Sequence, residues 1–336
     1  MEKSKMIRVL LGIFCVLFVL PFSAQAADGL LKQSVTVNGV ERDYLIHLPA
    51  GFKPKAGPYP VVMAYHGGGG TAEGMADMTR LNDTADKYGF IAVYPEGTAP
   101  EGKNRFRTWN AGTCCGTAME KKVDDVAYSS AIMDELRDQF RADPKRIYLT
   151  GHSNGAMMVY RLACALSERV AAVAPNAGQN VFHACPDARP MPVMHIHGTA
   201  DKCALYGGGT CGGCFSDFLG GGDEGGESWE CLGVRESMWR RARDYGCTRK
   251  TEITDKRRNM TCERWAGCTV YEGEVTLCSV AGGGHNWPGG ATGLKLCESR
   301  PNGVLCRKWM RATGPYNDDI PLNDMMWTFF KRWERP

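Results

Sequence analysis

The chain has 336 residues, a formal net charge of +3 at pH 7 and 43% hydrophobic residues. These values exclude a disordered or strongly basic chain, so we expect no nucleic-acid partner. After residue 26 no apolar run is long enough to span a bilayer, so we expect no membrane partner for the mature form.

The first 26 residues have the pattern of a secretory signal peptide. A basic start with Lys3, Lys5 and Arg8 precedes a nearly continuous apolar run over 9–20, and small residues at 24–26 suit cleavage. Cleavage there would lower the net charge from +3 to +1 and leave residues 27–336, which we expect to form a single catalytic domain. We therefore expect a secreted or periplasmic protein.

Cysteine usage agrees with export. Of 15 cysteines, only Cys15 lies in the leader, and the even number that remains predicts disulfides. The sequence does not fix their pairing. The alternative is a zinc site at Cys203, Cys211, Cys214 and Cys231, but an oxidising compartment favours disulfides, so we expect no metal.

Short apolar runs alternate with helical patterns, which is typical of an α/β fold with a mostly parallel sheet and helices on both faces. Several strands are apolar at every position, as strands covered on both faces are. The expected strands are Gln33–Val37, Tyr44–Leu48, Val61–Tyr65, Ile91–Tyr94, Ile147–Thr150, Ala171–Ala174, Val193–Ile196 and Val275–Val280. The expected helices are Ala76–Tyr88, Val126–Phe140, Gly155–Leu166, Glu236–Tyr245 and Leu322–Trp333, and the pair Asp124-Asp125 suits a helix N-terminus.

Two segments interrupt this alternation. Residues 202–233 are rich in Gly and Cys, and residues 288–319 form a second long loop that contains Cys297 and Cys306. Long irregular loops in a compact domain are usually functional. We expect two disulfide-stapled insertions that form walls of a binding site.

The most informative motif is the G-x-S-x-G over Gly151–Gly155, between an expected strand and an expected helix. The glycines allow a sharp turn with Ser153 at its apex, at a helix N-terminus and within reach of a histidine. We interpret Ser153 as a catalytic nucleophile. The alternative is a Gly-flanked turn with a capping Ser.

A serine nucleophile needs a histidine base and a carboxylate that orients the base. Of seven histidines, only His285 lies beyond the last expected strand, in a Gly-rich loop, and we predict that it is the base rather than a surface residue. We predict that Asp201 is the acid because it follows the strand Val193–Ile196. The rivals Asp187, Asp217 and Asp223 follow no strand, and His195 and His197 are interpreted as core histidines.

An oxyanion hole needs two backbone N–H groups. One belongs to Asn154, the residue after the nucleophile. The Gly-rich loop 65–70 supplies the other, for which we favour Gly68 over Gly67. Phosphate binding by this loop is the alternative, but the Lys-Ser/Thr of a P-loop is missing. Trp109 and Trp287 lie beside these motifs and are candidate substrate-binding residues, with a core position as the alternative for each.

Taken together, these motifs resemble the secreted feruloyl esterase and poly(3-hydroxybutyrate) depolymerase family of α/β-hydrolases, over most of Val35 to Phe330. The resemblance implies an α/β-hydrolase fold and cofactor-free hydrolysis of carboxylic esters by Ser153, Asp201 and His285, with Gly68 and Asn154 as oxyanion donors. It is carried, in chain order, by Tyr65–Gly68, Tyr94–Gly97, Trp109–Gly112, Cys114–Gly116, Val123–Val126, Arg146–Met158, Arg161–Cys164, His197–Asp201 and Gly284–Gly289.

Both insertions depart from the common pattern of that family, and we find no appended polymer-binding domain. We therefore expect a small or polysaccharide-linked ester as substrate, such as a feruloyl or acetyl ester of plant cell wall. The alternatives are a polyhydroxyalkanoate or other polyester depolymerase, a serine peptidase of the same fold, and a secreted binding protein with an inactive triad.

Overall fold

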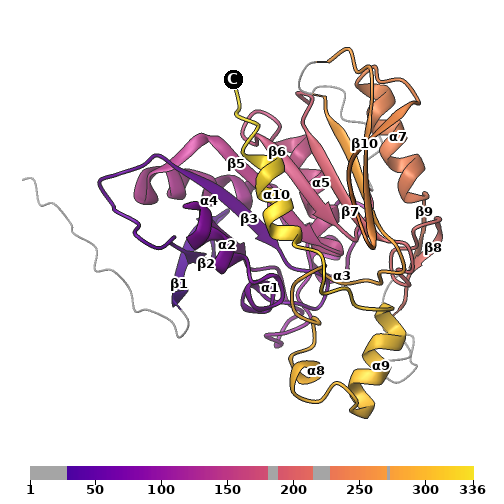
Figure 1. The fold of residues 1–336 in the computed structure, drawn as a ribbon. Helices are drawn as coiled ribbons and strands as arrows, with labels where there is room; N and C mark the ends of the chain where they lie inside the picture. The colour runs from indigo at the N-terminus through magenta and orange to yellow at the C-terminus, as the bar shows by residue number, and fades with distance from the viewer. Residues whose placement is uncertain (1–28, 181–187, 215–227, 271–272) are drawn as a thin grey trace, which may run out of the picture.

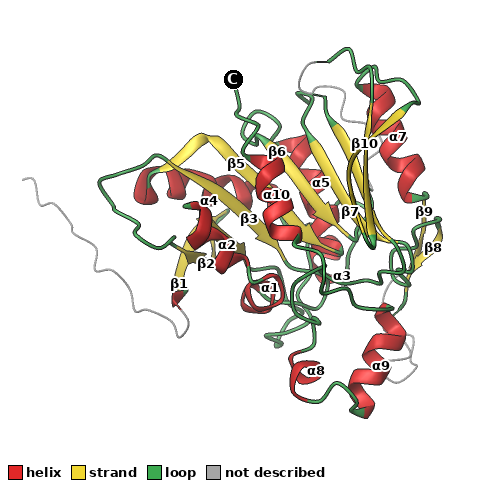
Figure 2. Cartoon of the chain, viewed as in Figure 1, coloured by secondary structure: helices red, strands yellow, loops and turns green. Residues whose placement is uncertain are grey.

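The computed structural model describes residues 29–180, 188–214, 228–270 and 273–336, so the expected leader lies outside the described residues. Within these residues, a ten-stranded sheet crosses the molecule and carries helices on both faces (Figures 1 and 2). No helix in this part of the chain combines the length and the apolarity needed to cross a membrane.

The sheet is parallel at its centre and antiparallel at both edges. The central strands β4, β3, β5, β6, β7 and β12 are all parallel, in that order. Antiparallel pairs close the edges, β2 and β1 on one side and β11 and β10 on the other. The strands are β1 Leu31–Val37, β2 Val40–His47, β3 Tyr59–Tyr65, β4 Ile91–Pro95, β5 Ala142–His152, β6 Ala172–Asn176, β7 Val193–Gly198, β10 Thr251–Arg257, β11 Met260–Trp265 and β12 Val275–Val280.

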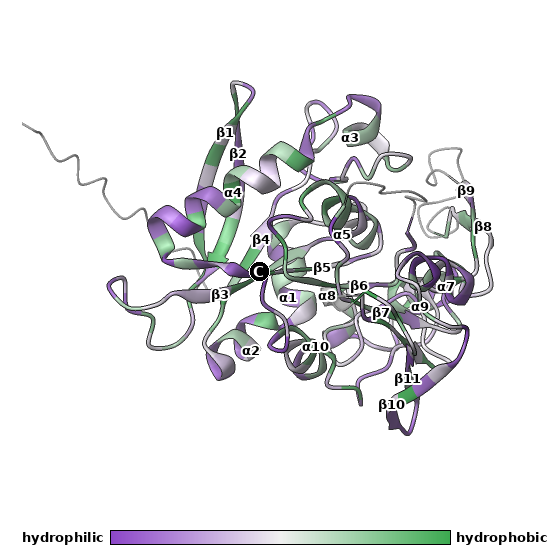
Figure 3. Ribbon diagram, turned by 90° about the horizontal axis from the view of Figure 1, so that it is seen from above, coloured by the Kyte–Doolittle hydropathy of each residue, from purple (hydrophilic) through white to green (hydrophobic). Residues whose placement is uncertain are grey.

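Alternate residues of the central strands face two separate cores. On β3, Val61, Met63 and Tyr65 lie in one cluster, whereas Val62 and Ala64 lie in the other. The view along the sheet shows α4 and α5 on one face and α2 and α10 on the opposite face (Figure 3). The helices are α1 Ala72–Thr79, α2 Leu81–Tyr88, α3 Gly116–Glu120, α4 Asp125–Phe140, α5 Asn154–Ala165, α7 Val234–Asp244, α8 Lys295–Ser299, α9 Val304–Thr313 and α10 Leu322–Phe330.

The expected strands are all present, with β12 at its predicted bounds and the others with shifted ends. Asp124 caps α4 as expected, since its side chain accepts a hydrogen bond from the Ala127 N–H. The mostly parallel sheet covered on both faces is therefore confirmed.

Three expectations about elements were wrong. The single helix over Ala76–Tyr88 is two helices, because Arg80 adopts a left-handed conformation with φ of 51° and separates α1 from α2. The loop over 288–319 contains α8 and α9. The edge strands β10 and β11 were missed because β10 carries charges on both faces and lacks an apolar run.

Disulfides staple both insertions, as expected. Cys203–Cys214 and Cys211–Cys231 close the first insertion around the hairpin of β8 (Gly209–Gly212) and β9 (Ser228–Cys231), so these sulfurs are not free to bind zinc. Cys297–Cys306 links α8 to α9 in the second. The other bridges with both cysteines described are Cys114–Cys115, Cys247–Cys268 and Cys262–Cys278.

Candidate active site

Ser153 occupies the turn between β5 and α5, with φ of 56° in the left-handed region. The flanking glycines make this turn sterically feasible. A Cβ on Gly151 would lie 2.6 Å from the backbone of Gly155, and a Cβ on Gly155 would overlap the carbonyl oxygen of Tyr65 at the end of β3. The G-x-S-x-G spacing therefore reflects close backbone packing of the turn against β3.

Three of the predicted residues lie in hydrogen-bond contact. Nε2 of His285 is 2.8 Å from Oγ of Ser153, and Nδ1 of His285 is 2.8 Å from Oδ2 of Asp201. Ser153 is partly exposed, whereas the other two side chains are buried. These residues follow β5, β7 and β12, whose carboxyl ends meet at one edge of the sheet. The arrangement can remove a proton from the serine hydroxyl and hold the resulting imidazolium.

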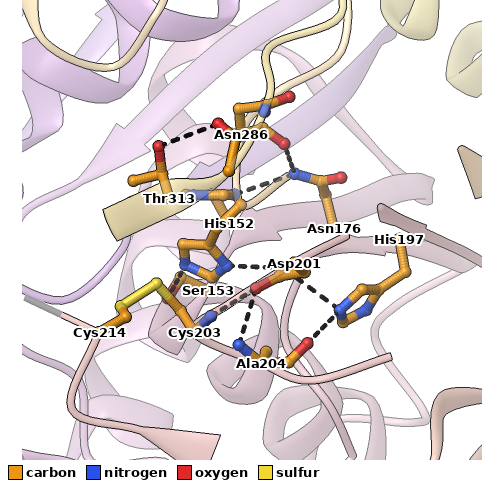
Figure 4. Close-up of polar contacts among 12 residues, drawn as sticks. His152, Ser153, Asn176, His197, Asp201, Cys203, Ala204, Cys214, Asn286 and Thr313 are labelled. Atoms are coloured by element: carbon orange, nitrogen blue, oxygen red, sulfur yellow. Dashed lines mark hydrogen bonds and ion pairs between the residues drawn. A yellow bond between two sulfur atoms is a disulfide. The ribbon is translucent and has the colours of Figure 1, made fainter. Parts of the chain in front are cut away.

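Asp201 is held by donors from its own loop and from β7 (Figure 4). The backbone N–H groups of Cys203 and Ala204 each donate to Oδ1 at 2.8 Å, and Nε2 of His197 lies 3.3 Å from Oδ2. Burial alone would raise the pKa of Asp201. The charge of His285 and the hydrogen bonds from His197 and His285 outweigh burial and lower that pKa well below its usual range. The acid therefore stays ionised.

The loop that carries His285 is held by the end of the second insertion. The backbone N–H of His285 donates to the carbonyl of Thr313, and the N–H of Gly284 donates to the carbonyl of Pro315 at 2.7 Å. The Asn286 side chain donates to the same Pro315 carbonyl at 2.7 Å. The base therefore depends on a segment that the sequence analysis placed in a structureless loop.

A second histidine lies beside the base. The ring of His152 is 4.7 Å from the ring of His285, and its Nδ1 is 2.9 Å from the side-chain nitrogen of Asn176. The same Asn176 nitrogen donates to the carbonyl of Asn286 at 2.9 Å. Burial, followed by the nearby charge of His285, lowers the pKa of His152 well below its usual value. Asn176 was not predicted from the sequence, because nothing in an apolar strand marks its last residue as a polar support.

The Gly-rich loop after β3 lies against the nucleophile turn. A Cβ on Gly67 would lie 3.2 Å from Cβ of Ser153, and one on Gly68 would lie 3.8 Å from Cβ of Asn154. His66 holds this loop, with Nδ1 2.8 Å from the Gly67 carbonyl and Nε2 accepting from the Gly97 N–H at 3.0 Å. Burial lowers the pKa of His66 to about 4, so the ring is neutral at pH 7.

The two tryptophans that are candidate substrate-binding residues are both buried. Trp109 is fully buried, its backbone N–H donates to Oδ1 of Asn154 at 2.8 Å, and its indole nitrogen donates to the His66 carbonyl at 2.9 Å. Trp287 is also fully buried and donates to Asn323 at 3.0 Å. Neither indole presents a surface to a bound substrate in this structure, which favours the core alternative. Trp109 instead connects the Gly-rich loop to the start of α5.

Among the described residues, one group brings three metal-type ligand atoms together: Asp201, Cys203 and His285. The sulfur of Cys203 is bonded to Cys214, and the carboxylate and imidazole are bonded to each other, so this group is a poor fit to a metal ion. The rival acids Asp187, Asp217 and Asp223 lie outside the described residues.

Comparison with known proteins identifies a family for the chain. The family described as esterase PHB depolymerase matches residues 42–210. The bifunctional acetylxylan esterase/xylanase XynS20E of Neocallimastix patriciarum is 31% identical over 50% of this chain and 22% of that protein. Feruloyl esterase B of Piromyces equi is 29% identical over 73% of this chain and 42% of that protein. The protein NocK of Nocardia uniformis subsp. tsuyamanensis is 30% identical over 77% of this chain and 74% of that protein.

The chain thus spans less than half the length of the first two of these relatives. Among solved structures, the acetyl xylan esterase from Aspergillus awamori has a TM-score of 0.51 and 17% identity, over 80% of this chain and 97% of that one. That likeness shows a shared α/β-hydrolase fold.

Proposed function

Because the chain belongs to the esterase PHB depolymerase family, we propose that it is a serine hydrolase of carboxylic esters. One observation carries the proposal: an uninterrupted line of hydrogen bonds, each 2.8 Å long, joins Ser153 through His285 to Asp201. Such a line is the arrangement that activates a serine hydroxyl.

The reaction proceeds by two acyl-transfer steps. Oγ of Ser153 attacks the ester carbonyl while Nε2 of His285 accepts its proton, and Asp201 stabilises the imidazolium. The imidazolium then protonates the leaving alcohol, which departs and leaves an acyl group on Ser153. His285 next removes a proton from water, whose oxygen attacks the acyl carbon, and the imidazolium returns this proton to Oγ of Ser153 as the acid leaves.

The oxyanion of each tetrahedral intermediate is held by backbone N–H groups of Gly68 and Asn154. The approach of the Gly-rich loop to the nucleophile turn supports this assignment, with Gly67 next to Ser153 and Gly68 next to Asn154, as does the fixing of both segments by His66 and Trp109. Donors that are fixed before the reaction lose no free energy to reorganisation when charge develops, and one such donor is typically worth about 3 kcal/mol in the transition state.

The proposed substrate is a feruloyl or acetyl ester of plant cell-wall polysaccharide. Two relatives named as an acetylxylan esterase and a feruloyl esterase support this class. The family description supports a second candidate, the hydrolysis of poly(3-hydroxybutyrate) or a related polyester. Export of the enzyme is part of the proposal, supported by the leader pattern and by disulfides in both insertions.

A fluorophosphonate probe tests the activated serine directly. We expect labelling of the oxidised protein at Ser153, located by mass spectrometry, and none in Ser153→Ala. Methyl ferulate, acetylated xylan and a polyhydroxybutyrate suspension then separate the candidate substrates. A folded protein that neither reacts with the probe nor hydrolyses any of these esters would overturn the proposal in favour of a secreted binding protein.

A further inference from the structure

A line of buried polar groups runs from Asp201 into the core between β7 and the helices α5 and α7. His195 and His197 are two residues apart on β7, so both rings project from the same face of the sheet. The hydroxyl of Tyr160 lies 2.8 Å from Nδ1 of His195, and Nε2 of His195 lies 3.0 Å from Nδ1 of His197. Nε2 of His197 then lies 2.7 Å from the Ala204 carbonyl and 3.3 Å from Oδ2 of Asp201.

With both rings neutral, the hydrogen atoms of this line can be arranged in only one way. The Ala204 carbonyl and the Asp201 carboxylate only accept, so Nε2 of His197 carries the hydrogen. Nδ1 of His197 is then an acceptor, and Nε2 of His195 must donate to it. Nδ1 of His195 accepts in turn, so the Tyr160 hydroxyl donates. The donors therefore run in one direction, and the last one, on Nε2 of His197, is shared between the Ala204 carbonyl at 2.7 Å and Oδ2 of Asp201 at 3.3 Å.

The surroundings of His195 favour a neutral ring. His195 and Tyr160 are fully buried. Burial, with the neighbouring His197, lowers the pKa of His195 well below its usual value. The cation Arg241 of α7 lies over the Tyr160 ring at 5.3 Å, and the ring of Tyr206 meets His197 edge-on at 6.0 Å. His197 and His285 both contact Oδ2 of Asp201. A permanent positive charge on His197 would therefore repel the positive charge that His285 gains during the reaction.

We propose that His197, His195 and Tyr160 are positioning residues that fix the rotation of the Asp201 carboxylate through a neutral, one-directional line of hydrogen bonds. No proton moves along the line. The inference rests on the proposed function, because the orientation of Asp201 matters only if His285 acts as the base.

The carboxylate needs this additional contact. The backbone donors from Cys203 and Ala204 both reach Oδ1, so they leave the direction of Oδ2 to His285 and His197 (Figure 4). His285 moves charge and protons in each cycle, whereas His197 does not. His197 is therefore the constant partner of Oδ2, the oxygen of Asp201 that faces His285.

The first test pairs Tyr160→Phe with Tyr148→Phe. Each change removes a hydroxyl hydrogen bond of 2.8 Å, buried for Tyr160 and partly buried for Tyr148, whose hydroxyl donates to the carbonyl of Trp333, away from the line. Tyr160→Phe also removes a 3.7 Å contact with the sulfur of Met238. We expect Tyr160→Phe to lower kcat about fivefold with KM unchanged within about twofold, and Tyr148→Phe to leave both within about twofold. Equal effects of the two changes on kcat would overturn the proposal.

The second test compares His197→Gln with His197→Leu. Gln retains an N–H donor near the position of Nε2, whereas Leu retains only the volume. We expect kcat to fall about a hundredfold in His197→Leu and about tenfold or less in His197→Gln, with both proteins folded and still labelled slowly by the fluorophosphonate. Equal losses in the two variants, or losses confined to KM, would assign His197 to packing alone.

A third measurement does not depend on activity. Nitrogen-detected NMR of the wild-type imidazoles at neutral pH should show His195 and His197 as neutral Nε2–H tautomers, with His195 altered in Tyr160→Phe. An Nδ1–H tautomer or a charged ring at either position would overturn the line as drawn. If the wild-type protein hydrolyses no ester, the proposed function fails, and the tautomers still decide whether the line exists.

Discussion

The nucleophile and the base are held by different parts of the molecule. The turn at Ser153 packs against the carboxyl end of β3, in the parallel centre of the sheet. The loop at His285 instead packs against Thr313 and Pro315, at the end of an insertion closed by Cys297–Cys306. One half of the site is therefore built into the regular sheet, and the other half is attached to a stapled loop.

Disulfides concentrate in the part of the chain that follows Asp201, where four lie in connections and one, Cys262–Cys278, joins the neighbouring strands β11 and β12. Of the six bridges with both cysteines described, five lie C-terminal to Asp201. Parallel strands order their own carboxyl ends through main-chain hydrogen bonds and buried apolar side chains. Long connections lack that support, and covalent links restrict their unfolded conformations instead. The comparison predicts that the two halves respond differently to matched changes.

The largest effect is expected from Gly155→Ala on the nucleophile side. The added Cβ would overlap the Tyr65 carbonyl oxygen, which is backbone and cannot move without distorting β3. We expect loss of fluorophosphonate labelling and destabilisation of about 3 kcal/mol or more in urea unfolding. Gly207→Ala is the control, because its Cβ would have no atom within 4 Å. Normal labelling of Gly155→Ala would show that the turn is not set by this packing.

On the base side, Gly284→Ala should act on activity more than on stability. Its Cβ would overlap the Thr313 carbonyl and the backbone of Gly314, which belong to the insertion rather than to a strand of the sheet. We expect kcat to fall about a hundredfold, because His285 moves away from Ser153, while the midpoint of urea unfolding changes less than in Gly155→Ala. If Gly284→Ala unfolds the protein as fully as Gly155→Ala, the two halves are one cooperative unit.

Low pH should lower the free energy of unfolding through His66, which holds the Gly-rich loop on the nucleophile side. Its pKa is about 4 in the folded chain against 6.5 for an unperturbed histidine, so the unfolded state binds more protons between those values. The stabilisation is complete above about pH 7 and is lost as pH falls from 6.5 toward 4, by about 3 kcal/mol for this residue alone. Urea unfolding across this range measures the loss.

His66→Gln provides the matched variant, because Gln can donate to the Gly67 carbonyl and accept from the Gly97 N–H without titrating. Its stability should depend less on pH than that of the wild type, although His152 and His195 contribute in the same direction. Parallel curves for the two proteins would exclude His66 as a source of the acid sensitivity.

The same division separates what the sequence predicted from what it did not. The strand Val275–Val280 and the spacing around Ser153 follow from local apolar runs and from glycines with a steric reason. Helix α8 has only five residues, too few for a periodic pattern, whereas α9 is amphipathic and was overlooked within the segment assigned to a loop. Whether Trp109 is exposed or buried stayed open in the sequence, because its partner, Asn154, is far along the chain and proximity in sequence to a motif does not indicate exposure.

The smallest effect is expected from removing the Cys297–Cys306 disulfide of the second insertion, with Cys297→Ser combined with Cys306→Ser. The bridge closes a short loop, so its loss should cost at most about 3 kcal/mol, and the cost should fall mainly on the insertion. We expect kcat to fall about threefold, since Thr313 still accepts from the His285 N–H but belongs to a less ordered segment.

The matched double variant Cys247→Ser with Cys268→Ser opens a bridge near β10 and β11 and should leave kcat within about twofold while lowering stability comparably. A larger loss of kcat from that bridge would mean that the base is held by the sheet edge rather than by the second insertion.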